Sequence, residues 1–308
     1  MISTKEMILL SIILSAFLCG CSVGEETEPG QIDQFPSPMV DNIRTHERIK
    51  NKDVPDISIV LKDVLSKPVE VYFTDQSNKS GPMDLLIHFH GSSYVPKRAV
   101  CDSNHPLLLA VVNLGSGSSV YENVFQNQST FPRLVEMIYR KASERKAAKI
   151  KPSRTYLSSF SAGYGAVRAI LKNHQPTIDG IVLLDGLHTD YIPSRRILSQ
   201  GGKLNDEKLR DFIQYARLAM DNKKKFLITH SEIFPGTYAS TTETTDFLIH
   251  SLHLRRHPVL KWGPVGMQLL TETRAGGLTV LGFAGNSAPD HVDHFHGLPV
   301  FLKMILDK

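Results

Sequence analysis

The chain has 308 residues, 41% of them hydrophobic, so it can bury a sizeable core, and one large α/β domain is the simplest organisation. Its formal net charge of +4 is small for this length. The small charge, together with the lack of helix-turn-helix, RNA-binding and zinc-finger patterns, argues against a nucleic-acid partner.

The N-terminus has the pattern of a secretory signal. Lys5 precedes an apolar run over residues 7–19, which is short for a membrane span but has the length of a signal's apolar region. The run ends in LCGC, which resembles the lipobox of bacterial lipoproteins, where the residue corresponding to Cys21 is acylated and becomes the mature N-terminus. The resemblance implies a signal peptide over residues 1–21 and a lipid-anchored protein outside the cytoplasm, in the cell envelope, facing the periplasm or at the outer membrane. A plain cleaved signal or a short anchor is the alternative.

Residues 22–50 are polar and proline-containing, which is typical of a flexible tether. In residues 51–308, which we expect to form one domain, apolar strand-like segments alternate with amphipathic helical segments. This alternation predicts an α/β fold, a mostly parallel central sheet with helices on both faces. The predicted strands are 57–65, 69–73, 84–90, 108–114, 155–157, 178–185, 225–230 and 278–283. The predicted helices include 131–145, 165–171, 206–220, one that ends at 254, and 299–306.

The most informative segment surrounds Ser161. An extended run at 155–157 leads through Ser159-Phe160-Ser161-Ala162-Gly163 into the helix over 165–171. Strand, tight turn and helix form the context of a nucleophile elbow, whose usual pattern is G-x-S-x-G, although Ser159 here replaces the first glycine. Such a turn exposes the serine hydroxyl and places the Ala162 N–H at a helix N-terminus, where developing negative charge is stabilised. An ordinary Ser/Gly-rich loop is the alternative, and the flanking elements favour the elbow.

Further polar residues follow other predicted strands. His90 and Gly91 end the strand over 84–90, and Asp185 ends the strand over 178–185, where a buried carboxylate is costly unless its charge is used. The last strand is followed by the histidine-rich segment 290–296, which we expect to be a loop. Because ligands bind at the carboxyl ends of parallel strands, these residues are expected to share one site.

The chain order of serine, acid and histidine resembles that of the α/β-hydrolase superfamily, from Ile57 to Lys308. The His-Gly strand end and the serine turn look like those of serine esterases. The resemblance implies an α/β-hydrolase fold with Ser161 as nucleophile. It also implies an oxyanion hole formed by the N–H groups of Ala162 and of the loop at Gly91, where the donor is Ser92 or Ser93.

The acid and the base have more than one candidate each. Asp185 is preferred as the acid, because its place matches the arrangement of pancreatic-type lipases, and Glu232 is the alternative. For the base we favour His294 over His291, because His294 lies closer to the expected start of the final helix, and His296 is a third candidate.

The histidine cluster also permits a metal hypothesis, since His291 and His294 with Asp290 or Asp293 could bind zinc. An H-x-x-H pair without an HExxH helix or a distant third ligand is weak evidence for such a site. We therefore expect no metal and no cofactor.

Together these features predict a membrane-anchored serine hydrolase that cleaves the carboxylic ester of a small molecule or a lipid through an acyl-enzyme. An alcohol acceptor in place of water would make the same site an acyltransferase. The alternative from another class is a lipoprotein whose hydrolase fold serves only to bind a ligand.

Overall fold

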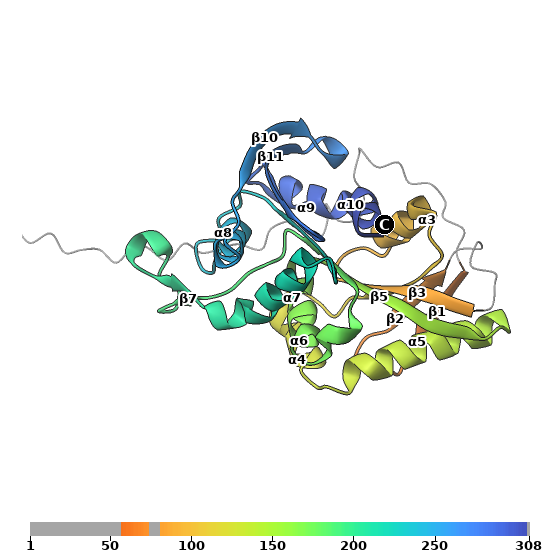
Figure 1. The fold of residues 1–308 in the computed structure, drawn as a ribbon. Helices are drawn as coiled ribbons and strands as arrows, with labels where there is room; N and C mark the ends of the chain where they lie inside the picture. The colour runs from red at the N-terminus through yellow and green to blue at the C-terminus, as the bar shows by residue number, and fades with distance from the viewer. Residues whose placement is uncertain (1–56, 74–80, 307–308) are drawn as a thin grey trace, which may run out of the picture. The chain divides into compact units, whose positions relative to one another are not determined.

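The computed structural model describes residues 57–73 and 81–306, all within a compact unit, Gln34–Lys308 (Figure 1). The expected signal peptide, Cys21 and the tether over 22–50 lie outside the described residues. None of the helices in the described ranges is long and apolar enough to cross a membrane.

Most of the predicted strands are present in one large sheet. Its strands are β1 (Ile57–Leu61), β2 (Val69–Phe73), β3 (Gly81–Phe89), β4 (Leu107–Val112), β5 (Ile150–Phe160), β6 (Gly180–Leu184), β9 (Lys225–His230), β10 (His257–Trp262), β11 (Gln268–Ala275) and β12 (Leu278–Phe283). The short strands β7 (Tyr191–Ile192) and β8 (Lys203–Leu204) pair separately. The α-helices are α3 (Tyr94–Ser103), α4 (Ser118–Phe125), α5 (Thr130–Lys146), α6 (Tyr164–His174), α7 (Arg210–Met220), α8 (Thr241–Ser251), α9 (Ala288–His296) and α10 (Leu298–Leu306).

The sheet has ten strands in the order β1-β2-β4-β3-β5-β6-β9-β12-β11-β10. Pairing is parallel from β4 through β12 and antiparallel at the two margins. The central strands β4 and β6 are buried along their whole length, because they are continuous runs of aliphatic residues covered on both faces.

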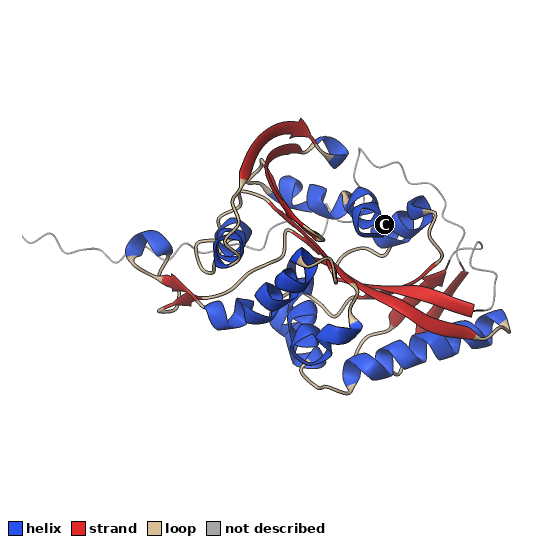
Figure 2. Cartoon of the chain, viewed as in Figure 1, coloured by secondary structure: helices blue, strands red, loops and turns tan. Residues whose placement is uncertain are grey.

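Helices cover both faces of this sheet (Figure 2). One core cluster packs helices α4 to α8 against one face, and a second packs α3, α9 and α10 against the other (Figure 1). The predicted α/β-hydrolase fold, with a mostly parallel sheet between two layers of helices, is confirmed.

The segment after β12 is helical, and our expectation of a loop there was wrong. Helix α9 begins with a capping box, in which the Ser287 hydroxyl accepts from the Asp290 N–H and the Asp290 carboxylate accepts from the Ser287 N–H. Pro289 occupies the first turn, and Val292 and Phe295 face the core at helical spacing. The histidines of this segment therefore point in directions fixed by a helix.

Candidate active site

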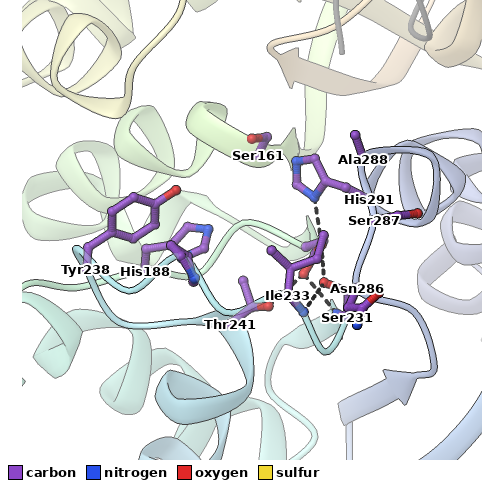
Figure 3. Close-up of a pocket in the computed structure, with 12 residues that line it drawn as sticks. Ser161, His188, Ser231, Ile233, Tyr238, Thr241, Asn286, Ser287, Ala288 and His291 are labelled. Carbon is purple, nitrogen blue, oxygen red and sulfur yellow. Dashed lines mark hydrogen bonds and ion pairs between the residues drawn. The ribbon is translucent and has the colours of Figure 1, made fainter. Parts of the chain in front are cut away.

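Polar residues gather where the central parallel strands end. A cavity of about 150 Å³ lies at this edge, shown in Figure 3. Its lining comes from the turns that follow β5, β6, β9 and β12 and from the start of α8. The lining residues are Ser161, Asp185, His188, Ser231, Ile233, Pro235, Tyr238, Thr241, Asn286, Ser287, Ala288 and His291.

Ser161 stands at a sharp bend between β5 and α6. Phe160 is extended, with φ −112° and ψ 139°, and Ser161 then takes the left-handed φ of 46°. A positive φ in a residue other than glycine costs about 1–3 kcal/mol and is typical of functional sites. The bend leaves Ser161 partly exposed at the cavity rather than buried in the sheet. This is the geometry expected of a nucleophile elbow.

Small residues after the bend let backbones approach closely. A Cβ at Gly163 would lie 2.2 Å from the Phe89 carbonyl oxygen, and a Cβ at Gly165 would lie 2.2 Å from the Ser118 carbonyl oxygen. Ser159, which replaces the first glycine of the usual pattern, is fully buried, and its hydroxyl has no hydrogen-bond partner among the residues that the structure describes.

Asp185 directly follows β6 and also has a positive φ, 41°. Its Oδ1 accepts from the Ser231 N–H at 2.9 Å and the Thr241 hydroxyl at 2.6 Å. Its Oδ2 accepts from the Ser231 hydroxyl at 2.7 Å and from His291 Nδ1 at 2.6 Å. All of these groups donate, so the surroundings suit a carboxylate and not a carboxylic acid.

The same contacts fix the charge of Asp185. Burial disfavours the ionised form, but the adjacent His294 and His291 rings and the hydrogen bonds from His291 and Thr241 outweigh it, so that the pKa of Asp185 lies well below its usual value. The side chain is therefore a buried anion at neutral pH.

His291 connects Asp185 to the cavity. Because a carboxylate only accepts, His291 Nδ1 carries the proton, and in the neutral ring Nε2 has a free lone pair. The ring packs on Phe160 with centroids 4.6 Å apart, and His291 and Ser161 line the same cavity (Figure 3). No hydrogen bond joins Ser161 to His291 among the described residues. The structure thus brings Ser161, His291 and Asp185 together, in the order of a nucleophile, a base and an acid.

The histidine that we favoured from sequence, His294, is placed elsewhere. It is fully buried one helical turn beyond His291, with Nδ1 2.8 Å from the Thr229 hydroxyl. Burial lowers the pKa of His294, and it does not line the cavity. His296 is also buried outside the cavity lining. The geometry therefore favours His291 as the base.

The alternative acid, Glu232, is exposed, and its carboxylate accepts from the Gly285 N–H at 3.3 Å. It has no hydrogen bond to a histidine in the part of the chain that the structure describes. Asp185 is thus the carboxylate that lies behind His291.

The expected oxyanion donors differ in their availability. The Ala162 N–H belongs to the first turn after the bend, where helix N–H groups lack intrahelical partners. The Gly91 N–H already donates to Asn113 Oδ1 at 2.9 Å, while Asn113 Nδ2 donates to the Gly91 carbonyl at 2.8 Å. This leaves Ser92 as the second donor candidate. Gly91, Ser92 and Ala162 border the strand ends but do not line the cavity itself.

The loop at Gly91 is held rigidly. Buried His88 accepts from the Ser158 hydroxyl at 2.8 Å and donates to the His90 carbonyl at 2.9 Å. A Cβ at Gly91 would lie 2.6 Å from the Phe295 ring, so only glycine fits there. These contacts fix the backbone direction next to Ser161.

Several residues of the site were given no individual role from sequence. Ser231 and Thr241 donate to Asp185, and His188 forms another wall of the cavity. The N-cap of α8 is Ser240, which forms a capping box with Glu243. The S-x-x-E pattern of Ser240 and Glu243 is the sequence signature of this cap. The Thr241 hydroxyl is therefore not needed as a cap and donates to Asp185 instead.

The described ranges contain no group of three or more His, Cys, Asp or Glu side chains that could hold a metal ion. His291 Nδ1 and His294 Nδ1 instead bond to Asp185 and Thr229. The zinc hypothesis therefore finds no third ligand in this part of the chain.

A scan against protein-family models finds no match, and a search of curated proteins finds none either. Among solved structures, S-formylglutathione hydrolase (FrmB) from Staphylococcus aureus, as the apoenzyme, is similar to this chain. The two are 12% identical, with a TM-score of 0.44, over 83% of this chain and 99% of that chain. At this degree of likeness the neighbour's activity carries no argument about this chain.

Proposed function

We propose that the protein is a serine hydrolase that cleaves a carboxylic ester through an acyl-enzyme. The observation that carries the proposal is the hydrogen bond of 2.6 Å from His291 Nδ1 to buried Asp185, in a cavity that His291 shares with Ser161. A buried anion that sets the tautomer of a histidine beside a serine on a strained turn is the arrangement that activates a hydroxyl as a nucleophile.

In the first step the Ser161 oxygen attacks the ester carbonyl, and His291 Nε2 takes the hydroxyl proton. The tetrahedral oxyanion receives hydrogen bonds from the N–H groups of Ala162 and Ser92. Collapse breaks the bond to the alcohol, which leaves with the proton from His291. Water then attacks the acyl-enzyme, again through His291, and releases the carboxylic acid and the free Ser161 hydroxyl.

The test uses the full chain in detergent and p-nitrophenyl acetate. The protein is expected to hydrolyse the ester and to be labelled by a fluorophosphonate, and Ser161→Ala is expected to lose both properties. Ser159→Ala is the matched control, because it removes a neighbouring hydroxyl that is buried and makes no hydrogen bond. Equal activity of the wild type and Ser161→Ala would reject the proposal.

The non-catalytic alternative has one observation in its favour, since Ser161 and His291 form no hydrogen bond within the described residues. Catalytic hydrogen bonds often tighten only when substrate binds, so this observation does not decide between the two. A ligand-binding lipoprotein would leave Ser161 unlabelled by the fluorophosphonate, and a metal-dependent hydrolase would lose activity to a chelator but keep it in Ser161→Ala.

We further propose that Cys21 is acylated and holds the domain at a membrane surface of the cell envelope through the tether over 22–50. The support is the lipobox-like end of the apolar run. Incorporation of radiolabelled palmitate in a bacterial host is expected for the wild type and for Cys19→Ala, and not for Cys21→Ala. Labelling of Cys21→Ala at the wild-type level would contradict the assignment.

A further inference from the structure

The wall of the cavity opposite His291 carries a second histidine, His188, beside Tyr238 (Figure 3). Its ring is fixed by edge-to-face contacts with Tyr164 and Tyr238, with centroids 5.5 and 5.0 Å apart. It is also fixed by a hydrogen bond of 2.9 Å between Nδ1 and the Ala239 carbonyl oxygen. The catalytic steps proposed above do not use this ring.

The hydrogen bond to Ala239 determines which nitrogen of His188 carries the proton. A carbonyl oxygen can only accept, so Nδ1 must donate. Burial lowers the pKa of His188 below its ordinary value, so the ring is neutral at neutral pH and has no second proton. Its Nε2 is therefore a hydrogen-bond acceptor, and no hydrogen bond in the described part of the chain involves it.

Three hydroxyls around the cavity already donate to carboxylates. The Ser231 and Thr241 hydroxyls donate to Asp185, and the Ser287 hydroxyl donates to Asp290 at 2.6 Å. Apolar side chains of Ile233, Pro235 and Ala288 supply much of the remaining lining. His188 Nε2 is thus an acceptor of fixed orientation in a largely apolar cavity, whose lining also includes Asn286.

The size of the cavity limits what can reach this acceptor. Its volume is about 150 Å³, and engineered cavities of about this volume hold one benzene molecule. A group of roughly six non-hydrogen atoms therefore fits.

We propose that the cavity receives a short, hydroxyl-bearing group of the ester and that His188 Nε2 accepts the hydrogen bond from that hydroxyl. This inference rests on the proposed function and names its substrate class, the esters of small hydroxylated acids or alcohols. His188 is a specificity-determining residue in this assignment. A site built to bond a substrate hydroxyl rejects analogues that lack it, because its own polar group is then left unpaired.

The test compares matched ester pairs on the full chain in detergent. On the acyl side, p-nitrophenyl butyrate is compared with its 2-hydroxy and 3-hydroxy derivatives. On the alcohol side, ethyl butyrate is compared with 2-hydroxyethyl butyrate. In at least one pair we expect a kcat/KM at least tenfold higher for the hydroxylated ester. Equal values within every pair, with hydrolysis that still depends on Ser161, would overturn the inference and leave the proposed function standing.

Substitutions of His188 test whether this residue causes the preference for the hydroxylated ester. His188→Phe is expected to bring the ratio of kcat/KM within the preferred pair close to one. His188→Gln, which offers an amide oxygen, is expected to keep part of the ratio. An unchanged ratio in His188→Phe would overturn the assignment, and the wild-type pairs test the proposal even if that variant does not fold. Failure of the proposed function is recognised separately, as hydrolysis of every ester that persists in Ser161→Ala.

Discussion

The sharpest test of the site is Asp185→Asn, which changes one oxygen of the side chain to an amide group. The hydrogen bonds dictate how the asparagine must sit. The Ser231 N–H that faces Oδ1 is a backbone donor and cannot reverse, so the amide oxygen must occupy the place of Oδ1. The amide NH2 then occupies the place of Oδ2 and points at His291 Nδ1.

An NH2 group facing Nδ1 forces His291 into the other tautomer. Nδ1 must accept, so Nε2 carries the proton and cannot receive one from Ser161. In the productive tautomer, with the proton on His291 Nδ1, this N–H would face the NH2 group of the new asparagine. One hydrogen bond would be lost and a buried donor left unpaired, which costs about 4 kcal/mol in total. Because about 1.4 kcal/mol corresponds to a factor of ten, and the imidazolium also loses its counter-charge, we expect kcat to fall by about 10³ to 10⁴-fold.

The assay is steady-state hydrolysis of p-nitrophenyl acetate, together with the rate of fluorophosphonate labelling of Ser161, and both rates should fall together. Asp179→Asn is the matched control, since Asp179 lies just before the other end of β6 and accepts from the Thr155 N–H at 2.8 Å. A kcat for Asp185→Asn within tenfold of the wild type would refute this account of the tautomer.

Three further predictions concern the base, the turn and the buried histidines. In His291→Gln, kcat is expected to fall by at least about 10³-fold. In His294→Gln, kcat should stay within tenfold of the wild type, because the amide can still bond the Thr229 hydroxyl. The reverse result would favour His294 as the base. Gly163→Ala should destabilise the fold by about 1–3 kcal/mol in urea unfolding, because its Cβ meets the Phe89 carbonyl oxygen, and an unchanged midpoint would contradict the close approach. Burial lowers the pKa of His88 to about 3 and of His230 to about 4, so between pH 6.5 and 4 the unfolded chain binds more protons than the folded one. Each ring should therefore cost about 1.4 kcal/mol of stability per pH unit on acidification, and urea unfolding that shows constant stability over this range would be inconsistent with neutral buried rings.

The fold and the sharp turn at Ser161 were predictable because their signals are local. Continuous aliphatic runs such as Leu107–Val112 mark buried parallel strands, and the strand-turn-helix context of Ser161 is contained in about twenty residues. Asp185 was predictable for a related reason, since a charged side chain that directly follows a buried strand is costly unless it is paired and hydrogen-bonded.

Which histidine contacts Asp185 could not be predicted from sequence, because His291 and His294 differ only in their position along one helix. Both lie in α9 and both are buried, yet only His291 reaches Asp185, and one turn later His294 reaches Thr229. The choice depends on where the helix begins relative to the sheet, which Ser287 and Asp290 determine through their capping box. The hydrogen bonds from Ser231 to Asp185 could not be predicted either, because the two residues follow different strands and are far apart in the sequence.

Backbone strain at the strand ends is a second property that residue types do not reveal. The neighbouring strands β3, β5 and β6 are each followed at once by a non-glycine residue with positive φ: His90 at 69°, Ser161 at 46° and Asp185 at 41°. Sequence patterns lead one to expect glycine at such values, and each of these residues costs about 1–3 kcal/mol. The buried sheet supplies the stability that holds them, through strands whose aliphatic side chains are fully enclosed. Of the three, Ser161 and Asp185 line the cavity, while the His90 ring stacks on Phe160 and bonds the Tyr121 hydroxyl next to it. Strain at three adjacent strand ends, more than any one motif, therefore indicates a functional site at this edge of the sheet.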